Sequence, residues 1–297
     1  MLNDSHCHFF SSQFFATLSR QRGRGDTVEA LCRELQWEDP AAPQALADRW
    51  VLELDRNGVS RAALIASVPG DEGSVAEAVG RHPGRFVGFF MVDPSANDAV
   101  ARVRHAVTRL GLRGICLFPA MHHVATSDGR VERIVEAAAA QPGTAVFVHC
   151  GVLSVGVRKK LRLPSRFDLR LGDPLGVCRL ALTFPHVPFI VPHFGAGLLR
   201  ETLMAADVCA NIHLDTSSSN NWMRYTPGLT LAAVFRTAVS LLGPSRLLFG
   251  TDSSFFPRGW QRGVYEAQRA AAGAAGITEA DQALIFGGNF DRLFPSQ

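Results

Sequence analysis

The chain begins with an aspartate and two histidines at alternating positions: LNDSHCHFF contains Asp4, His6 and His8. Alternate side chains of an extended strand point to the same face, so the imidazoles of His6 and His8 can reach one metal ion while Cys7 points away. Because the chain has ten histidines in 297 residues, one such pair is a weak signal by itself. A metal site needs further ligands elsewhere in the sequence.

Three further residues of suitable chemistry each follow a short apolar run. His149 ends AVFVH, His193 ends FIVPH, and Asp252 follows LLFGT. Any one of these histidines is more simply interpreted as a hydrogen-bonded core residue. It is implausible, however, that four histidines and an aspartate should each end a predicted strand by chance. Three imidazoles and a carboxylate suit Zn2+, with Fe2+ or Mn2+ as alternatives, and a catalytic ion keeps one position for water. We therefore predict a catalytic metal site.

Eight apolar runs that alternate with helix-like stretches predict the elements that carry these residues. The predicted strands are residues 2–7, 62–67, 86–92, 114–118, 145–149, 188–193, 210–215 and 246–250. Eight strand and helix units in a chain of this length predict an α/β fold, the (β/α)8 TIM barrel. No Gly-x-Gly-x-x-Gly follows a strand, which disfavours a doubly wound sheet. In a barrel the C-terminal strand ends meet at one face, where the active site lies.

Two connections are too long to be simple turns: residues 9–40 after the first strand and residues 150–170 after the fifth. Long loops in a compact domain are usually functional or disordered. We interpret residues 9–40 as a loop insertion in a single domain of residues 1–297. Its phenylalanines predict either a lid or pocket wall above the barrel mouth, or a small satellite core; they are Phe9, Phe10, Phe14 and Phe15.

The composition excludes several partners. The formal net charge is +3, and the 28 arginines and two lysines are interspersed with acidic residues, so neither nucleic acid nor a membrane is an expected partner. Six scattered cysteines without a Cys-x-x-Cys pair fit a reducing compartment, and no secretory signal precedes the first strand, so we expect a cytoplasmic protein. The expected partner is a small-molecule substrate.

The pattern DSHCH, VHC, PHFGAG, FGTD and IFGGNFDRLF resembles the amidohydrolase superfamily, from Asp4 to Phe294. The similar branch contains decarboxylases of the aminocarboxymuconate-semialdehyde type and small metal-dependent hydrolases. The resemblance implies that one divalent ion is bound by His6, His8, His149 and Asp252. It also implies that His193 is a general base or electrophile, with Asp252 as a second proton acceptor. Related decarboxylases are often dimers, so a homodimer is expected from the resemblance.

The reaction is predicted from what the motifs lack. LRGICLFP contains neither the lysine that bridges two ions in dinuclear members nor the glutamate of TatD-type deoxyribonucleases. Cys150-Gly151 and Ser253-Ser254 stand where the decarboxylases typically have proline and a Tyr-Pro-like pair. We therefore expect a hydrolase of a small anionic or ring-containing ester, lactone or amide. The alternatives are a decarboxylase of an aromatic or enoic carboxylic acid and, less favoured, a non-catalytic binding barrel.

Residues on the predicted mouth loops are candidates for substrate binding. An arginine there can clamp a substrate carboxylate, although a solvated surface arginine is the simpler interpretation of each one. Asp215 is expected to orient a ligand histidine, and Asp4 to be a supporting inward residue. His122 and His123 could line the pocket or lie in an exposed loop. The predicted substrate-binding residues are Arg158, Arg224, Arg258 and Trp222.

Overall fold

The computed structural model describes residues 1–296 and forms a nearly closed barrel of eight parallel strands in the order β1 to β8. Each strand overlaps a predicted one, and the predicted TIM barrel is confirmed. The strands are β1 (Asn3–Phe9), β2 (Arg61–Ala66), β3 (Phe86–Val92), β4 (Gly114–Leu117), β5 (Ala145–Val148), β6 (Phe189–Val191), β7 (Ile212–Asp215) and β8 (Leu247–Leu248).

The segment that follows β8 completes the barrel by running along β1. Ser5 N donates to Phe249 O (2.8 Å), Asp252 N donates to His6 O (2.9 Å), and His8 N donates to Ser253 O (2.7 Å). These backbone hydrogen bonds fix the two segments in register. The closure of the barrel therefore places Asp252 directly beside the two histidines of β1.

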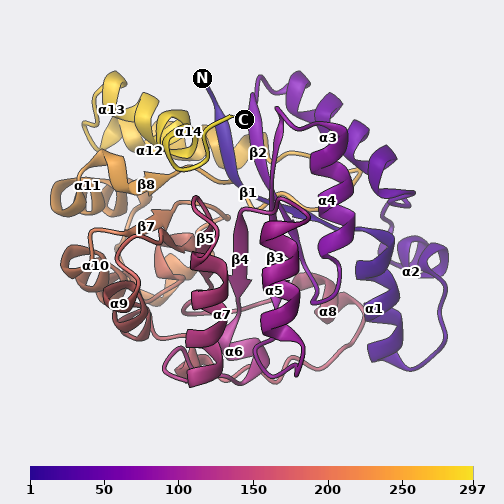
Figure 1. The fold of residues 1–297 in the computed structure, drawn as a ribbon. Helices are drawn as coiled ribbons and strands as arrows, with labels where there is room; N and C mark the ends of the chain where they lie inside the picture. The colour runs from indigo at the N-terminus through magenta and orange to yellow at the C-terminus, as the bar shows by residue number, and fades with distance from the viewer. Residues whose placement is uncertain (297) are drawn as a thin grey trace.

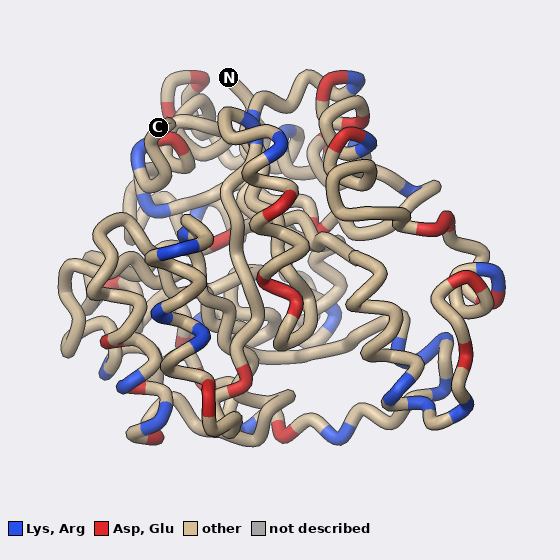
Figure 2. The backbone as a smooth tube through the Cα atoms, turned by 45° about the vertical axis from the view of Figure 1, so that its right-hand side comes forward, with Lys and Arg blue, Asp and Glu red and all other residues tan. Residues whose placement is uncertain are grey.

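Helices surround the barrel, as Figure 1 shows. The longer outer helices pack apolar residues against the strands; Trp50 of α3, for example, is completely buried. Basic and acidic residues are interspersed along the chain in Figure 2. No helix among residues 1–296 combines the length and hydrophobicity needed to cross a bilayer. The longer outer helices are α3 (Pro43–Arg56), α4 (Glu72–Arg81), α5 (Ala99–Thr108), α7 (Gly129–Ala139), α9 (Pro174–Thr183), α10 (Leu199–Val208), α11 (Leu231–Leu242) and α12 (Arg262–Ala274).

The interior of the barrel is filled with apolar side chains and is closed at its N-terminal end by the last helix. Phe290 and Phe294, at the end of the chain, pack with inward residues such as Phe89 and Phe147. Arg61 at the start of β2 donates to the carbonyl of Phe294 (2.7 Å). The C-terminal end is thus the open end. The short helices are α6 (Pro119–His122), α8 (Gly156–Lys160), α13 (Glu279–Ala283) and α14 (Asn289–Leu293).

Residues 9–40 form two helices, α1 (Ser12–Arg22) and α2 (Val28–Leu35), and not the predicted loop. Hydroxyls cap both: Phe14 N donates to Ser11, and Ala30 N donates to Thr27. Their apolar faces pack on α8, beside which they lie in Figure 1. The predicted satellite core is confirmed, and it contains Phe14, Phe15, Leu18, Leu31, Leu35, Val157 and Leu161. Phe9, which the sequence grouped with these phenylalanines, packs instead in the core between the barrel and the helices.

The buried histidine of β7 makes the fold sensitive to acid. Burial and the nearby charges of Arg246 and Arg292 lower the pKa of His213 to about 3. Between pH 6.5 and 3, His213 is protonated in the unfolded chain but neutral in the folded chain. Each pH unit of acidification in this range therefore lowers the free energy of unfolding by about 1.4 kcal/mol. When the pH falls from 6.5 to 5, we expect the free energy of unfolding of the wild type to drop by about 2 kcal/mol more than that of His213→Gln.

Urea denaturation at the two pH values measures this difference. His186→Gln is the matched control, because His186 is an exposed histidine. If the His213→Gln and wild-type proteins lose equal stability over this range, the histidine of β7 is not the acid-sensitive group.

Candidate metal centre and active site

Three of the predicted metal ligands lie together at the open end of the barrel. The Nε2 atoms of His6 and His8 are 3.4 Å apart. Asp252 Oδ1 is 3.1 Å from His8 Nε2 and 3.7 Å from His6 Nε2. One potential ligand atom from each residue lies within 4.8 Å of the other two. Two imidazoles and a carboxylate so arranged can bind one cation.

Hydrogen bonds behind the two histidines point their free nitrogens at this site. His6 Nδ1 donates to Asp215 Oδ2 (2.7 Å), the predicted contact of Asp215 with a ligand histidine. His8 Nδ1 is 2.7 Å from the Ser67 hydroxyl, which itself donates to Ile65 O (3.0 Å). Since the Ser67 proton is already used, Ser67 accepts from His8 Nδ1. Both Nε2 atoms are left unprotonated, the state in which they bind a metal.

The charge states around the site also suit a metal ion. Burial lowers the pKa of His8, His149 and His193. Burial alone would also lower the pKa of His6, but the Asp215 carboxylate outweighs it and raises that pKa. For Asp252, burial would raise the pKa, but the contact with His8 and the nearby imidazoles outweigh burial and hold the pKa well below its usual value. At neutral pH the site therefore offers an ionised Asp252 carboxylate and the neutral imidazoles of His8, His149 and His193, the states in which these groups bind a metal.

His149 lines the same cavity but lies outside the close group of three ligand atoms. Its ring centroid is 5.3 Å from that of His193, and it stacks on Phe118 at 5.3 Å. Its Nδ1 atom is buried and has no hydrogen-bond partner within residues 1–296. A buried imidazole nitrogen of this kind calls for a partner that the protein does not supply. The residues present thus fit one divalent metal ion.

His193 stacks beside His6, with ring centroids 5.1 Å apart. Its Nδ1 lies 3.2 Å from Ser217 O and 2.9 Å from Ser217 Oγ, and Ser217 Oγ is also 2.9 Å from His6 Nδ1. Because the carbonyl can only accept, His193 Nδ1 carries the proton and Nε2 is the basic nitrogen. Sequence reasoning missed Ser217; its one signal was a position two residues after a strand-end aspartate.

The backbone at His193 and Asp252 is left-handed, with φ angles of 57° and 61°. Such angles are uncommon for residues other than glycine and often occur at functional sites. The Asp252 carbonyl accepts a hydrogen bond from Gln261 Nε2 (3.1 Å), which holds the turn after β8 in place. The two residues with the candidate chemical roles are thus held by turns of specific geometry.

The site opens into a cavity of about 410 Å³. His6, His8, His149, His193 and Asp252 all line it. Residues of the insertion also line it, and the predicted pocket wall is confirmed for Phe10 and Phe14. The cavity is also lined by Trp37, Lys160, Phe255 and Arg258.

The sequence profile of the amidohydrolase family matches residues 4–295. The chain belongs to this amidohydrolase family. No curated protein sequence matches it.

Solved structures similar to this amidohydrolase are enzymes of several reaction types. A 5-carboxyvanillate decarboxylase from Sphingomonas paucimobilis is 18% identical, with a TM-score of 0.67 over 100% of this chain and 99% of that one. A 4-oxalomesaconate hydratase from Rhodopseudomonas palustris is 16% identical, with a TM-score of 0.64 over 100% and 96%. A probable 2-pyrone-4,6-dicarboxylic acid hydrolase from Acinetobacter baumannii is 15% identical, with a TM-score of 0.60 over 99% and 98%. At sequence identities this low, these comparisons show only that the proteins share a fold with this chain.

Of the four predicted substrate-binding residues, the amidohydrolase pocket includes only Arg258. Arg158 instead donates to Gln21 Oε1 (2.5 Å) and Pro164 O (2.7 Å). Arg224 donates to the Tyr225 hydroxyl (2.8 Å), and Trp222 is buried with its Nε1 donating to Asn220 (3.1 Å). Their positions on mouth loops do not determine their side-chain directions. Lys160, which was not predicted, does line the pocket.

Two further predictions concern residues near the ligands. A bulge in β1 between Asp4 and Cys7 turns Asp4 to the outer face, so the prediction that it faces inward is wrong. Its carboxylate accepts from Trp260 Nε1 (2.7 Å) and Thr251 N (3.1 Å), and burial raises its pKa. His122 is half-buried and His123 is exposed, and neither lines the pocket.

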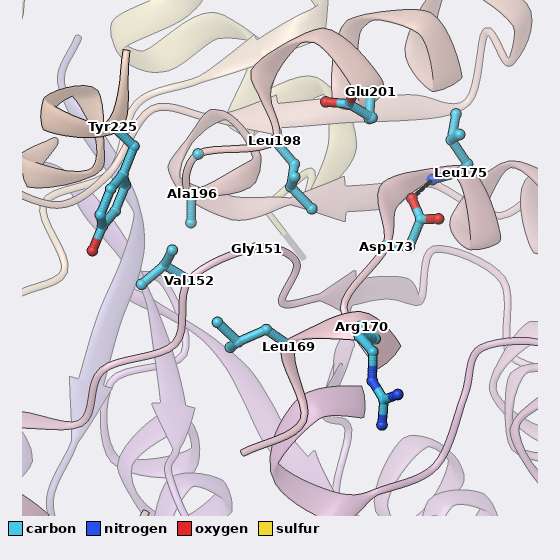
Figure 3. A pocket seen from close by; sticks show the side chains of 11 residues that line it. Gly151, Val152, Leu169, Arg170, Asp173, Leu175, Ala196, Leu198, Glu201 and Tyr225 are labelled. Atoms are coloured by element: carbon cyan, nitrogen blue, oxygen red, sulfur yellow. Dashed lines mark hydrogen bonds between the residues drawn. The ribbon is translucent and has the colours of Figure 1, made fainter. Parts of the chain in front are cut away.

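A larger cavity of about 510 Å³ lies on the other side of the loops after β5 and β6. Figure 3 shows Val152, Ala196, Leu198 and Tyr225 around it. No histidine lines this cavity among residues 1–296, and its charged groups already have partners. Asp173 accepts from Leu175 N, Arg170 pairs with Asp168, and Glu201 pairs with Arg200. The side chains capable of metal chemistry are therefore in the smaller cavity.

The Asp215 contact predicts a specific loss of metal affinity. We expect Asp215→Asn to bind Zn2+ about 10- to 100-fold more weakly, because His6 loses the carboxylate that orients its ring and raises its basicity. Competition with a chromogenic chelator measures the affinity. Asp207→Asn on the exposed face of α10 is the matched control. Equal affinities of the two variants would contradict the assigned role.

Proposed function

We propose that the protein is a metal-dependent hydrolase of a small anionic or ring-containing ester, lactone or amide. The observation that carries the proposal is the pair of His6 and His8 Nε2 atoms, 3.4 Å apart, facing the Asp252 carboxylate. Nitrogen and carboxylate ligands favour Zn2+, with Fe2+ and Mn2+ as alternatives. In support, a similar amidohydrolase structure from Burkholderia multivorans has bound zinc, and a 5-carboxyvanillate decarboxylase from Novosphingobium aromaticivorans has bound manganese.

His6, His8, His149 and Asp252 would hold the ion. When bound, a divalent ion supplies the charge that lowers the pKa of water and polarises a substrate carbonyl. The protein contributes the preset orientation of His6 and His8, through Asp215 and Ser67, and an apolar layer under the site. Phe147, for example, meets the His6 ring edge-on with centroids 5.1 Å apart.

His193 would move the protons of the reaction. It is neutral at pH 7 because burial lowers its pKa, and its Nδ1 is held by Ser217. Its Nε2 would accept a proton from the attacking water and return it to the leaving oxygen or nitrogen, so that water adds across the acyl bond. Asp252, ionised beside His8, is a second candidate for this proton.

Arg258 would bind an anionic group of the substrate. Its guanidinium lies over the Phe255 ring, 4.4 Å from the centroid, and donates to Ser254 Oγ (2.6 Å). Within residues 1–296 no carboxylate oxygen lies within 4.0 Å of it, the distance at which an ion pair would be formed. Its remaining N–H groups are thus available for a carboxylate, which arginine binds in a forked geometry.

Decarboxylation is the alternative reaction, and the Arg258 clamp suits it equally well. The assay must therefore record acid release and CO2 separately, over small lactones, amides, and aromatic and enoic carboxylic acids. We expect acid release without CO2. Release of CO2 from a carboxylic acid would make the protein a carboxy-lyase. Purified protein with no bound metal, and no stabilisation by added metal, would favour a non-catalytic barrel.

His193→Ala separates proton transfer from metal binding. Because His193 acts only as a base in this proposal, we expect the variant to retain one ion per chain and to lose about 10²- to 10⁴-fold in kcat. Metal analysis and steady-state kinetics of the same preparation give both values. His186→Ala, on the surface, is the control. A variant that loses the ion would move His193 into the ligand set.

Arg258→Met tests the substrate clamp. We expect KM for an anionic substrate to rise about tenfold or more, because a charge-assisted hydrogen bond is lost, while KM for a neutral analogue stays unchanged. Arg224→Met is the matched control, since Arg224 is a loop arginine outside the pocket. An equal rise in KM for both substrates would contradict a role in charge recognition.

A further inference from the structure

Lys160 is an unusual residue in this chain, which has 28 arginines and only two lysines. It ends α8, in the long connection after β5, and its side chain lines the metal-site cavity. The adjacent Lys159 is exposed, as Lys160 is, but it does not line this cavity. The chain therefore places one flexible, compact positive charge at the substrate pocket and its neighbour outside it.

An aromatic pair from two distant segments supports this charge. Trp37, just after α2, stacks on Phe255, after β8, with ring centroids 3.8 Å apart. Lys160 Nζ lies 5.5 Å from the Trp37 ring centroid and 5.9 Å from that of Phe255. The backbone of Glu38 donates to Phe256 O (2.9 Å), so the two segments are joined next to the pair. A cation over an aromatic face is held by the ring quadrupole.

Lys160 and Arg258 rest on the same Phe255 ring but at different depths. Arg258 reaches toward the metal ligands, since its Nη2 lies 3.4 Å from Asp252 O. Lys160 lies at the far end of a row of rings: His8 and Phe10 have centroids 5.6 Å apart, and Phe10 and Trp37 stack at 5.9 Å. The row of rings gives the cavity a flat apolar wall between the ligands and Lys160.

The charges of this pocket are unbalanced. Among the residues that line it, Asp252 carries the sole carboxylate, while Lys160 and Arg258 are both cationic. Within the described chain, neither cation has a carboxylate at ion-pair distance, whereas Arg22 of α1 lies 2.6 Å from Glu34. A divalent ion would add to the positive excess. A substrate with negative charge at more than one position would balance it.

We propose that Lys160 is a specificity-determining residue that binds a second anionic group of a planar, conjugated substrate, at the end remote from the metal ligands. Arg258 binds the first anionic group, and the ring of the substrate lies along the Phe10 and Trp37 wall. This inference rests on the proposed function, because it concerns the substrate of the same site.

The test uses isothermal titration of the zinc-loaded full-length protein with isophthalate, a planar dianion that cannot be hydrolysed, and with the neutral isophthalamide. We expect Lys160→Met to bind isophthalate about tenfold more weakly than the wild type, because a charge-assisted contact is lost. Lys159→Met is the matched control and should bind as the wild type does. Lys160→Arg should restore most of the affinity, and none of the three substitutions should change binding of isophthalamide.

Several results would overturn the proposal: equal isophthalate affinities of Lys160→Met and Lys159→Met, a parallel loss for isophthalamide, or no isophthalate binding by the wild type. Thermal unfolding of each variant identifies a loss that comes from misfolding, and Lys160→Arg then decides the case. Because the titration requires no turnover, it is independent of the catalytic assays. Absence of hydrolysis with every substrate would overturn the proposed function and leave the binding result in force.

Discussion

The hydrogen bond between His6 and Asp215 is the interaction on which the arrangement of the site depends. It joins β1 to β7 and fixes the ring of the central histidine, whose Nε2 faces the Asp252 carboxylate. The second oxygen of Asp215 accepts from Ser217 N (2.7 Å), so the carboxylate cannot rotate. Gly250 is required beside it, because an added Cβ would lie 2.8 Å from Asp215 Oδ1 and 2.9 Å from the His6 Cβ. The tautomer of His6 is therefore set by barrel closure and close packing together.

The sequence predicts where the strands lie along the chain and which candidate site residues follow them. Apolar runs locate the strands, and a residue at a C-terminal strand end must lie at the open face, so the sequence alone groups His6, His8 and Asp252. The direction in which a side chain points cannot be predicted from the sequence where the backbone departs from the regular alternation of a strand. One extra residue in β1 reverses the face of Asp4, and Arg158 and Arg224 turn away from the pocket although their loops border it. Helices α1 and α2 were missed although their capping residues, Ser11 and Thr27, were visible.

The insertion after β1 is better described as a folded wall than as a lid. Its satellite core buries Phe15 and Leu31 against α8, so the insertion is attached to the barrel by apolar contacts. Phe14 lies on α1, Phe10 precedes that helix and Trp37 follows α2, so the same contacts hold all three rings in the pocket wall. The hydrogen bond from Arg158 to Gln21 belongs to this attachment. Arg158 thus contributes to the pocket indirectly, because it fixes the short helix that ends at Lys160.

The arrangement of polar and apolar groups along the barrel axis also constrains how a substrate reaches the ligands. Below the histidines, the barrel is filled by apolar residues and closed by Phe290 and Phe294, so the site rests on an apolar floor. Charges over such an apolar floor interact more strongly than in bulk water, because the local dielectric constant is lower. The mouth carries Lys160 and Arg258 on an aromatic support. In the proposed binding mode, these two cations attract an anionic substrate and set its orientation in the pocket.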